Sequence, residues 1–551
     1  MPTELDRRFD ETLEAVTGSG GRLVIGRDAQ GRAIVENLPP TLPGLFRTFS
    51  ALNADAEAVV AGEERLTFGD LDRISERVAQ GLVARGIVKG DRVGIAMRNC
   101  PSWIVSYMGV IKAGGVATLL NGWWEELEME HAIHLAEPKL IIADAPRAKR
   151  IAAKCADTDI FSVPVELPVE QALAELLDSP DLALPEIAPE DDATLLFTSG
   201  STGESKGALS THRAVTTAAY AYAAGLIVLL GILASEGRAP AAQSRTLLSV
   251  PLFHVTGEVP VMINSFVIGR CMVIMPKWDA SEALRLIEKE KITYFVGVPT
   301  MSLELMNHPD RRNYDLSSLT DITAGGAPRP VSHVERLREE FPNAQPALGY
   351  GLTETNAAGC ANYWGNYAAK PASTGRAQKP FIELTILGEG DRHLPTGEVG
   401  EIAIRSASNI SCYWRNPEAT KALFTADNYL RTGDVGYVDE DGYLFIVDRK
   451  KEIIIRGGEN ISAAEVEAEC YACPHVAEVA VFAAPDERLG EVPVAVVHTK
   501  NGLSEEDLRA FLEPRIARFK IPARFIFSPE PLPKLGTGKI DRPSLKAQYA
   551  R

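Results

Sequence analysis

The sequence predicts an α/β protein: a large N-terminal domain of parallel α/β sheets plus a β-rich subdomain, with a small mobile α+β C-terminal domain. Three observations predict this architecture. Helical and strand-like patterns alternate from residue 66 to residue 298, strands dominate after residue 397, and a compact mixture of helices and strands ends the chain. Such alternation is typical of parallel sheets covered by helices.

The first half of the chain supplies the parallel sheets. Residues 1–45 lack periodicity and are interpreted as a lead-in, and residues 164–190, rich in proline and acidic residues, as a surface connection. Apolar patterns predict helices at 68–85 and 102–113 and strands at 92–96, 140–143, 194–198, 246–250 and 292–298.

The later elements are predicted from turn and capping signals. Asp439-Glu440-Asp441-Gly442 predicts a hairpin turn. Ser462 and Ser504 are each followed three residues later by an acidic residue, which is typical of helix N-termini. Strands are predicted at 399–404, 443–447, 476–482, 492–498 and 524–527. We expect an N-terminal domain of residues 1–450 and a C-terminal domain of residues 451–551.

Composition excludes several classes of function. The 551 residues are 45% hydrophobic and 24% charged, which is ordinary for a folded globular protein. The net charge of −17 opposes binding to nucleic acids and to anionic lipids, because both are polyanions. The seven cysteines are too scattered for a disulfide framework and are interpreted as reduced thiols of a cytoplasmic protein.

Residues 214–235 form the one candidate membrane segment, since no charge interrupts them and a membrane-spanning helix needs about 20 apolar residues. We interpret the segment as a helix buried in the large domain, because Ala, Gly, Thr and Tyr dilute its apolar half. Motifs on both sides of it also contribute to one predicted site. No transmembrane span is therefore expected, while a peripheral membrane contact and a homodimer stay open.

A loop rich in Gly, Ser and Thr follows the strand at 194–198 and predicts a polyphosphate site. Glycines let backbone N–H groups turn toward an anion, hydroxyl groups add donors, and a lysine adds a cation. The spacing differs from a Walker A loop, because the lysine lies three residues after the second glycine. The loop comprises Thr198, Ser199, Gly200, Ser201, Thr202, Gly203, Glu204, Ser205, Lys206 and Gly207.

This loop closely resembles the signature of the adenylate-forming superfamily, in its acyl-CoA synthetase branch. The resemblance covers about residues 45–545, with further motifs in the family's order. These motifs are Gly325-Gly326-Ala327-Pro328, Tyr350-Gly351-Leu352-Thr353-Glu354, Thr432-Gly433-Asp434, Asp448-Arg449-Lys450-Lys451-Glu452 and Pro533-Lys534-Leu535-Gly536-Thr537-Gly538-Lys539.

The resemblance implies a ligase that forms acyl-AMP and pyrophosphate from a carboxylic acid and ATP with Mg²⁺, and then uses coenzyme A to displace AMP. Lys539 would be the mobile catalytic cation, and Thr353 would contact the α-phosphate. Glu354 and Thr198 would hold the metal, and His254 would lie near the acyl pocket. The implied ATP-binding residues are Thr198, Ser199, Gly200, Ser201, Thr202, Gly203, Lys206, Gly326, Ala327, Pro328, Gly349, Tyr350, Gly351, Leu352, Thr353, Glu354, Asp434, Arg449 and Lys539.

The resemblance also implies that the C-terminal domain rotates between the two half-reactions. Lys451 occupies the hinge position of the family. Gly457, Gly458 and Glu459 match the segment expected near the coenzyme A thiol in the second state.

Two residues bear on the substrate. Amino-acid-adenylating domains usually carry Asp at the position of His254, where it pairs with the substrate ammonium, so His254 favours an acid without an α-amino group. Acetate-specific relatives carry Trp at the position of Gly351, so glycine predicts an open acyl path. We therefore expect a medium- or long-chain acid, or a bulky cyclic or aromatic one.

Other readings of the motifs stay open. The main alternative is an adenylating enzyme that passes acyl-AMP to a carrier protein. Luciferase-like oxidation and a non-catalytic nucleotide-binding protein are less favoured, the latter because every motif keeps its charged residue.

Overall fold

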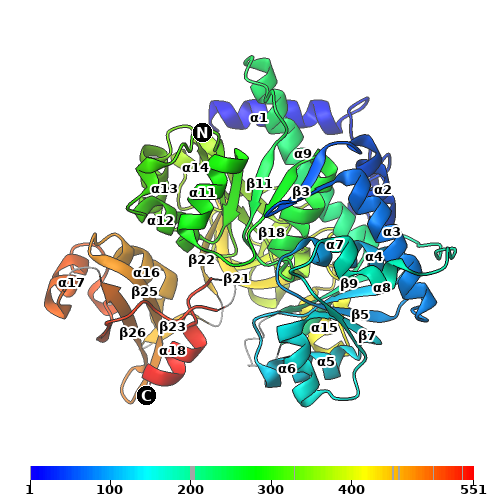
Figure 1. Cartoon of the computed structure of the whole chain (residues 1–551). Helices are drawn as coiled ribbons and strands as arrows, with labels where there is room; N and C mark the ends of the chain where they lie inside the picture. The colour runs from blue at the N-terminus through cyan, green and yellow to red at the C-terminus, as the bar shows by residue number, and fades with distance from the viewer. Residues whose placement is uncertain are drawn as a thin grey trace.

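The computed structural model describes residues 2–198, 205–327, 329–449, 452–456, 459–499, 502–535 and 538–550. A large domain built on two sheets carries a small α+β domain at one side, drawn in orange and red in Figure 1. The predicted α/β architecture is confirmed.

The first large sheet is parallel in its centre and antiparallel at one edge. Its strands, in spatial order, are β20 (Cys412–Tyr413), β10 (Lys206–Thr211), β9 (Asp192–Thr198), β6 (Val116–Leu119), β5 (Arg92–Ala96), β7 (Leu140–Asp144) and β8 (Ile160–Val163). The helices of this part are α3 (Phe68–Ala84), α4 (Pro101–Lys112), α5 (Glu126–Ala136), α6 (Ala145–Lys154), α7 (Val169–Ala172) and α8 (Ala174–Leu177).

The second sheet is larger and changes from parallel to antiparallel pairing at β15. Its strands, in spatial order, are β18 (Glu383–Leu387), β19 (Gly400–Arg405), β21 (Leu430–Val438), β22 (Tyr443–Arg449), β17 (Gly375–Ala377), β16 (Cys360–Tyr363), β15 (Gln345–Tyr350), β14 (Asp321–Gly325), β13 (Tyr294–Gly297), β11 (Arg245–Leu248), β12 (Cys271–Ile274), β3 (Glu57–Ala61) and β4 (Glu64–Thr67).

The helices of this second part connect its strands or pack beside them. They are α2 (Leu42–Leu52), α9 (His212–Ser235), the π-helix η1 (Gly257–Ile263), α10 (Asn264–Ile268), α11 (Ala280–Glu290), α12 (Pro299–Asn307), α13 (Val331–Glu340), α14 (Trp364–Ala369) and α15 (Pro417–Leu423), with short 3-10 turns η2 (Arg311–Asn313), η3 (Thr353–Thr355) and η4 (Glu389–Asp391). The helices and strands predicted for both parts begin and end within two residues of the predicted positions. The predicted hairpin turn joins β21 to β22.

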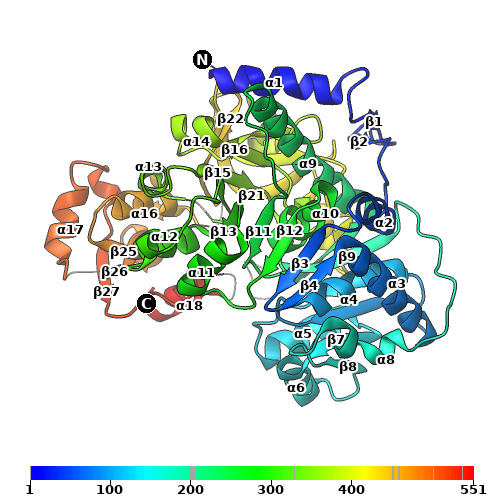
Figure 2. The same cartoon turned by 45° about the horizontal axis from the view of Figure 1, so that its top comes forward.

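One hydrophobic cluster fills the space between the two sheets. It joins Val93 and Leu119 of the first sheet to Leu248 and Met272 of the second, and α9 runs through it with Val228 fully buried. Figure 2 shows α9 in the middle of the large domain. Within the described residues α9 is the helix that is long and apolar enough to cross a bilayer, yet 61% of its most apolar window is buried in the protein. This burial agrees with the interpretation of residues 214–235 as a core helix.

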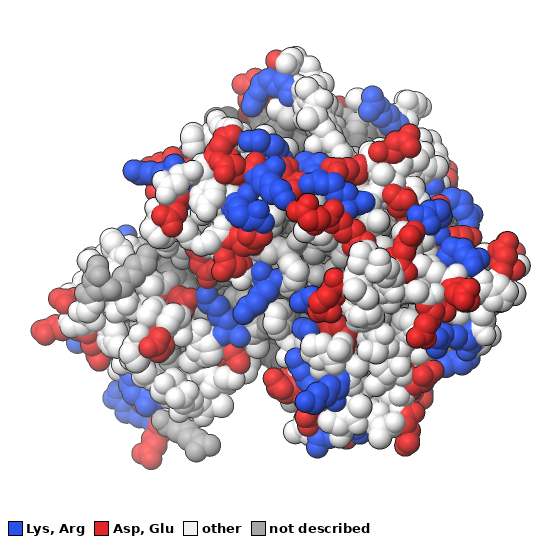
Figure 3. Space-filling view, in the orientation of Figure 1, with Lys and Arg blue, Asp and Glu red and all other residues white. Residues whose placement is uncertain are grey.

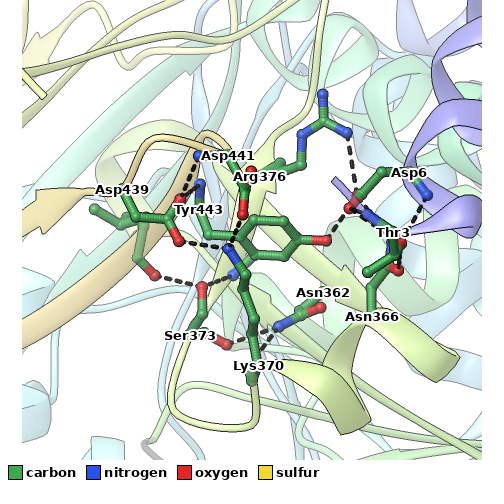
Figure 4. Close-up of polar contacts among 12 residues, drawn as sticks. Thr3, Asp6, Asn362, Asn366, Lys370, Ser373, Arg376, Asp439, Asp441 and Tyr443 are labelled. Atoms are coloured by element: carbon green, nitrogen blue, oxygen red, sulfur yellow. Dashed lines mark hydrogen bonds and ion pairs between the residues drawn. The ribbon is translucent and has the colours of Figure 1, made fainter. Parts of the chain in front are cut away.

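The N-terminal segment is not a lead-in, and that prediction was wrong. It forms α1 (Glu4–Thr17), β1 (Ile25–Arg27) and β2 (Ala33–Val35). Asp6 is 1% exposed and accepts hydrogen bonds from Asn366 Nδ2 at 3.0 Å, Tyr443 Oη at 2.7 Å and Arg376 Nη1 at 3.2 Å (Figure 4). These partners lie more than 350 positions away in the chain, so no local pattern could predict them.

Residues 164–190 were predicted as a surface connection, which is only partly right. The segment contains α7 and α8, and Val169, Leu173 and Leu176 are buried. The carbonyl oxygens of Leu177 and Ser179 accept hydrogen bonds from Arg77 of α3. These helices have four residues each, which is too short for periodicity to reveal.

The C-terminal domain has its own sheet and its own core. Its strands are β23 (Ile454–Arg456), β24 (Glu459–Ile461), β25 (Val476–Asp486), β26 (Gly490–Thr499) and β27 (Arg524–Ser528), and its helices are α16 (Ala463–Tyr471), α17 (Glu505–Leu512), the 3-10 turn η5 (Arg518–Lys520) and α18 (Arg542–Tyr549). The predicted caps are confirmed, because Ser462 Oγ accepts from the Glu465 amide and Ser504 Oγ accepts from the Asp507 amide.

The charged residues of the surface are mixed in sign. Figure 3 shows lysines and arginines interspersed with aspartates and glutamates over the face turned to the viewer, with blue side chains also at the junction of the two domains. This face therefore carries no continuous basic surface of the kind that nucleic acids need.

Candidate active site

The predicted site forms where parallel strands of the second sheet end. The chain leaves β14 at Gly325 and β15 at Tyr350, and the two strands are register neighbours through Gly325 and Gly349. Ligand sites of open α/β sheets lie at such carboxyl ends. The segments beginning at Gly326 and at Gly351, far apart in sequence, therefore meet at one edge.

The strands on either side of the predicted phosphate loop, β9 and β10, pair antiparallel in the other sheet. Thr198, at the end of β9, pairs with Lys206, at the start of β10. The Lys206 ammonium lies 4.9 Å from the centre of the Tyr413 ring. Several predicted site residues lie outside the described residues: Ser199, Gly200, Ser201, Thr202, Gly203, Pro328, Lys451, Gly457 and Gly458.

Tyr413 connects this hairpin to the predicted metal ligand. Tyr413 Oη donates a hydrogen bond of 2.6 Å to Glu354 Oε1. Burial and then the Glu354 charge raise the pKa of Tyr413, so its hydroxyl stays a donor. Sequence reasoning missed Tyr413, which lies in a two-residue strand with no motif around it.

Glu354 lies in the tight 3-10 turn η3, and a buried asparagine holds that turn. Asn356, 1% exposed, donates from Nδ2 to the Ser408 carbonyl oxygen at 2.8 Å and to Ser210 Oγ at 3.0 Å. Glu354 remains partly exposed, and its second carboxylate oxygen has no hydrogen-bond partner among the described residues. A carboxylate with an oxygen left over, beside the hairpin that flanks the predicted phosphate loop, is a suitable ligand for Mg²⁺, which prefers one or two carboxylates together with phosphate oxygens.

Asp434 comes into the site from β21. Tyr350 Oη donates a hydrogen bond of 2.7 Å to Asp434 Oδ2, and Asp434 is 4% exposed. Burial raises the pKa of Tyr350 well above its ordinary value, and the Asp434 carboxylate adds to that shift. Arg449 is the register partner of Asp434 on β22, which brings the two predicted ribose-binding positions together.

Lys539 reaches this site from the C-terminal domain. A Cβ atom on Gly326 would lie 3.5 Å from Lys539 Nζ and 3.3 Å from its Cε. Thr300 Oγ1 of α12 donates to the Gly538 carbonyl oxygen at 3.4 Å, and Lys534 Nζ lies 3.1 Å from Glu304 Oε1 of the same helix. The loop that carries the lysine is therefore docked on the large domain.

His254 lies beside this lysine in its neutral form. Its Nδ1 accepts a hydrogen bond from the Thr256 amide at 3.3 Å, which leaves Nε2 as the donor. Burial, and then the Lys539 charge, lower the pKa of His254 to about 3. The imidazole is thus a neutral hydrogen-bond donor at physiological pH.

The structure does not support an open acyl path at Gly351. A Cβ atom there would lie 2.0 Å from the Ala357 carbonyl oxygen, so glycine is required by the close approach of the backbone. Gly349 is different, because a Cβ atom there would meet nothing within 4 Å. Open space therefore begins two residues earlier than the motif predicts, on the face of β15 that it shares with Gly325.

A cavity of about 180 Å³ lies between the docked loop and the large domain. Its wall includes the cations Arg98, Arg147, Lys277 and Lys534, and Phe253, the neighbour of His254. Three further predicted residues follow the strand ends: Ala327 comes after Gly326, and Leu352 directly precedes Thr353, which opens η3. Glu459 begins β24 and is exposed.

Two protein-family models match the chain, one in the large domain and one in the C-terminal domain. The family of AMP-binding enzymes matches residues 46–414, and the C-terminal domain of AMP-binding enzymes matches residues 465–539. A long-chain-fatty-acid–CoA ligase of Bacillus subtilis is 34% identical over 538 residues, covering 91% of this chain and 93% of that protein. A feruloyl-CoA synthase of an Amycolatopsis species is 33% identical over 500 residues, covering 90% and 97%.

Solved structures resemble both domains together. A fatty acyl CoA synthetase of Mycobacterium tuberculosis superposes with a TM-score of 0.71 at 30% identity, covering 93% of this chain and 98% of that chain. An o-succinylbenzoate CoA synthetase of Bacillus subtilis, solved with its acyl-adenylate intermediate, gives a TM-score of 0.79 at 27% identity and covers 91% and 97%.

Proposed function

This chain belongs to the family of AMP-binding enzymes and is an ATP-dependent acid–CoA ligase, and we propose that it activates a medium- or long-chain acid, or a bulky cyclic or aromatic one. The acid and ATP give acyl-AMP and pyrophosphate, and coenzyme A then displaces AMP. The observation that carries the residue assignment is the position of Lys539 at the strand ends, beside Gly326 and His254.

In the first half-reaction a carboxylate must approach the negatively charged α-phosphate. We assign Lys539 the role of stabilising the negative charge that builds on both reactants, because a preorganised cation is most effective in a desolvated site. The Nε2–H group of His254 and the hydroxyl of Thr353 would hold the two anions in position. The rest of the phosphate-binding assignment is Thr198, Ser199, Gly200, Ser201, Thr202, Gly203, Lys206, Gly326, Ala327, Pro328 and Leu352.

Mg²⁺ would be held by Glu354, together with Thr198 from the hairpin. Bound Mg²⁺ supplies Lewis-acid neutralisation of the phosphate oxygens. Tyr413 would fix the orientation of the Glu354 carboxylate through its hydrogen bond, and the Lys206 ammonium lies over the face of the same ring. Asp434 and Arg449 would bind the ribose, with Tyr350 holding the carboxylate of Asp434.

In the second half-reaction the thiol needs access to the acyl carbon while Lys539 is withdrawn. We propose that residues 451–551 rotate about Lys451 as one domain, which the separate hydrophobic core of that domain supports. Gly457, Gly458 and Glu459 would then face the thiol. The cations that the large domain contributes to the wall of the cavity, Arg98, Arg147 and Lys277, would attract the phosphates of coenzyme A after the loop has withdrawn.

The acyl group would lie on the face of the second sheet that is turned toward α9, which we call the acyl face. Register pairing puts Tyr294, Thr323, Gly349 and Tyr363 on this one face, and all four are partly exposed. Burial nevertheless raises the pKa of Tyr294 and of Tyr363. A Cβ atom on Gly349 would meet nothing within 4 Å, so this face has open space there, and the acyl group would extend from that point between the partly exposed side chains.

Gly349→Leu tests this path. The isobutyl group would extend into the open space at Gly349, so we expect at least a tenfold lower kcat/KM for a long acid such as decanoate and little loss for propionate, because a pocket discriminates by the groups it admits. Acid-dependent AMP release in the presence of coenzyme A measures both. The KM for ATP is the control, and an equal loss for both acids would mean that the acyl group passes elsewhere.

A panel of acids with and without coenzyme A tests the function as a whole. We expect AMP release to depend on both the acid and coenzyme A, with apolar or aromatic acids far ahead of acetate. Efficient transfer to a carrier protein with no transfer to coenzyme A would favour the alternative acceptor. The substrates and the free cysteines among the described residues fit a cytoplasmic enzyme.

A further inference from the structure

The acyl face ends in polar side chains that the proposed chemistry does not use. Arg270, Tyr294 and Asp321 form what we call the distal cluster. Tyr294 and Asp321 are register partners on β13 and β14, and Arg270 directly precedes β12. Asp321 lies four residues before Gly325 on β14, which is roughly 13 Å from the reacting end of the site at the usual rise of a strand.

Arg270 is buried with hydrogen-bond donors left over. It is 3% exposed, and its guanidinium carbon lies 4.2 Å from the centre of the Tyr294 ring. Its Nε and Nη1 have no hydrogen-bond partner in the part of the chain that the structure describes. Buried donors are nearly always paired, since leaving one unpaired costs free energy. Burial also lowers the pKa of Arg270.

Asp321 balances the charge of Arg270 without giving it a hydrogen bond. Its Oδ1 accepts from Trp364 Nε1 at 2.9 Å, and its Oδ2 accepts from Thr320 Oγ1 at 2.8 Å. No ion pair within 4.0 Å joins Asp321 to Arg270 among the described residues. The Nε and Nη1 donors of Arg270 are therefore left without an acceptor among the described residues.

Helix α1 packs against the acyl face at Tyr363. The ring of Phe9 stacks on Tyr363 with 5.9 Å between the ring centres. Tyr363 Oη lies 2.9 Å from where a Cβ atom on Gly225 of α9 would stand. These contacts place α1 and α9 beside Tyr363, whose neighbour Trp364 donates a hydrogen bond to Asp321 of the distal cluster.

We propose that the acid of this enzyme carries an uncharged hydroxyl or carbonyl oxygen at the end remote from its carboxylate, and that Arg270 donates hydrogen bonds to it. The proposal rests on the proposed function, since it requires the acyl group to lie on the acyl face. An uncharged oxygen fits better than a second carboxylate, because Arg270 and Asp321 already balance each other and a further anion would be buried without a counter-charge. Arg270 is then a specificity-determining residue.

Matched pairs of acids test the proposal in the whole enzyme. The pairs are decanoate with ω-hydroxydecanoate and cinnamate with para-hydroxycinnamate, and the measurement is kcat/KM for coenzyme A-dependent AMP release. We expect the wild type to prefer the oxygenated acid of at least one pair about tenfold or more, because a site built to hydrogen-bond an oxygen rejects the analogue that lacks it. A wild-type preference for the apolar acid in both pairs would overturn the proposal.

Variants then assign the preference to one side chain. Arg270→Met should bring the ratio of the preferred pair close to one by lowering kcat/KM for the oxygenated acid, while Arg270→Lys, which keeps one donor, should retain part of it. Arg329→Met is the matched control, because Arg329 is also buried with unpaired nitrogens but lies against Tyr367 in a separate cluster. An unchanged ratio in Arg270→Met, or an equal fall in Arg329→Met, would refute the role of Arg270.

The Gly349→Leu variant separates this inference from the proposed function. If Gly349→Leu blocks long acids while Arg270→Met leaves the acid ratio unchanged, the acyl face is correct and the distal cluster is not. If Gly349→Leu affects long and short acids equally, the acyl face itself is wrong.

Discussion

Lys539→Ala is expected to slow acyl-AMP formation roughly a hundredfold or more, which is the usual cost of losing one preorganised charge-stabilising group. The lysine lies beside Gly326 and His254 in the docked state. Transfer from presynthesised acyl-AMP to coenzyme A should stay near the wild-type rate, because the lysine has left the site by then. Acid-dependent exchange of pyrophosphate into ATP and single-turnover transfer measure the two steps.

A second lysine provides the control for this result. Lys546→Ala removes an exposed lysine of α18 in the same domain and should change neither step. An equal loss of both steps in Lys539→Ala would instead mean that the lysine only supports the docked loop.

Lys451→Pro should spare acyl-AMP formation and slow transfer to coenzyme A, the reverse of the result expected for Lys539→Ala. Proline fixes φ near −65° and removes a backbone donor, so the chain could no longer make the backbone change that rotation requires. We expect near-normal acyl-AMP formation and at least about tenfold slower transfer to coenzyme A, with adenylate accumulating on the enzyme, since hinge positions absorb the φ/ψ change in such closures. Lys451→Ala is the control, and wild-type transfer in Lys451→Pro would exclude rotation about this residue.

Most of the helices and strands could be predicted because the signals for them lie in neighbouring residues of the sequence. The strand at 92–96 and the cap at Ser462 are visible in a few neighbouring residues. The N-terminal helix was missed although Thr3 and Asp6 form a capping box and Leu5, Phe9 and Leu13 recur at helical spacing. Its docking could not be predicted, because the buried Asp6 is satisfied by residues distant in the sequence.

The residues of the candidate site also fall into two groups, those that a motif predicts and those that only the fold brings together. Motifs predict Glu354, Asp434 and Lys539 as site residues, because their neighbours in sequence are distinctive. Tyr413 and Arg270 lie in no motif. Each was noticed only because the fold brings it into contact with a residue distant in the sequence, Tyr413 with Glu354 and Arg270 with Tyr294.

Gly351 shows how a correct motif can give a wrong structural reason. The glycine was interpreted as leaving space for the acyl group, whereas it makes room for the Ala357 carbonyl oxygen. The direction in which a missing side chain would point depends on the register of β15, and sequence spacing does not specify it.

We propose that one site serves both half-reactions because Lys539 moves in and out of it with the C-terminal domain. The most direct measurement cross-links the docked state. Glu304 and Lys534 form an ion pair of 3.1 Å between the two domains, so Glu304→Cys with Lys534→Cys can be joined by a short bis-maleimide, with each single variant treated in the same way as a control for the native cysteines. We predict that the cross-linked enzyme still exchanges pyrophosphate into ATP with the acid present but makes no acyl-CoA. Acyl-CoA formation at the rate of the untreated double variant would contradict the claim.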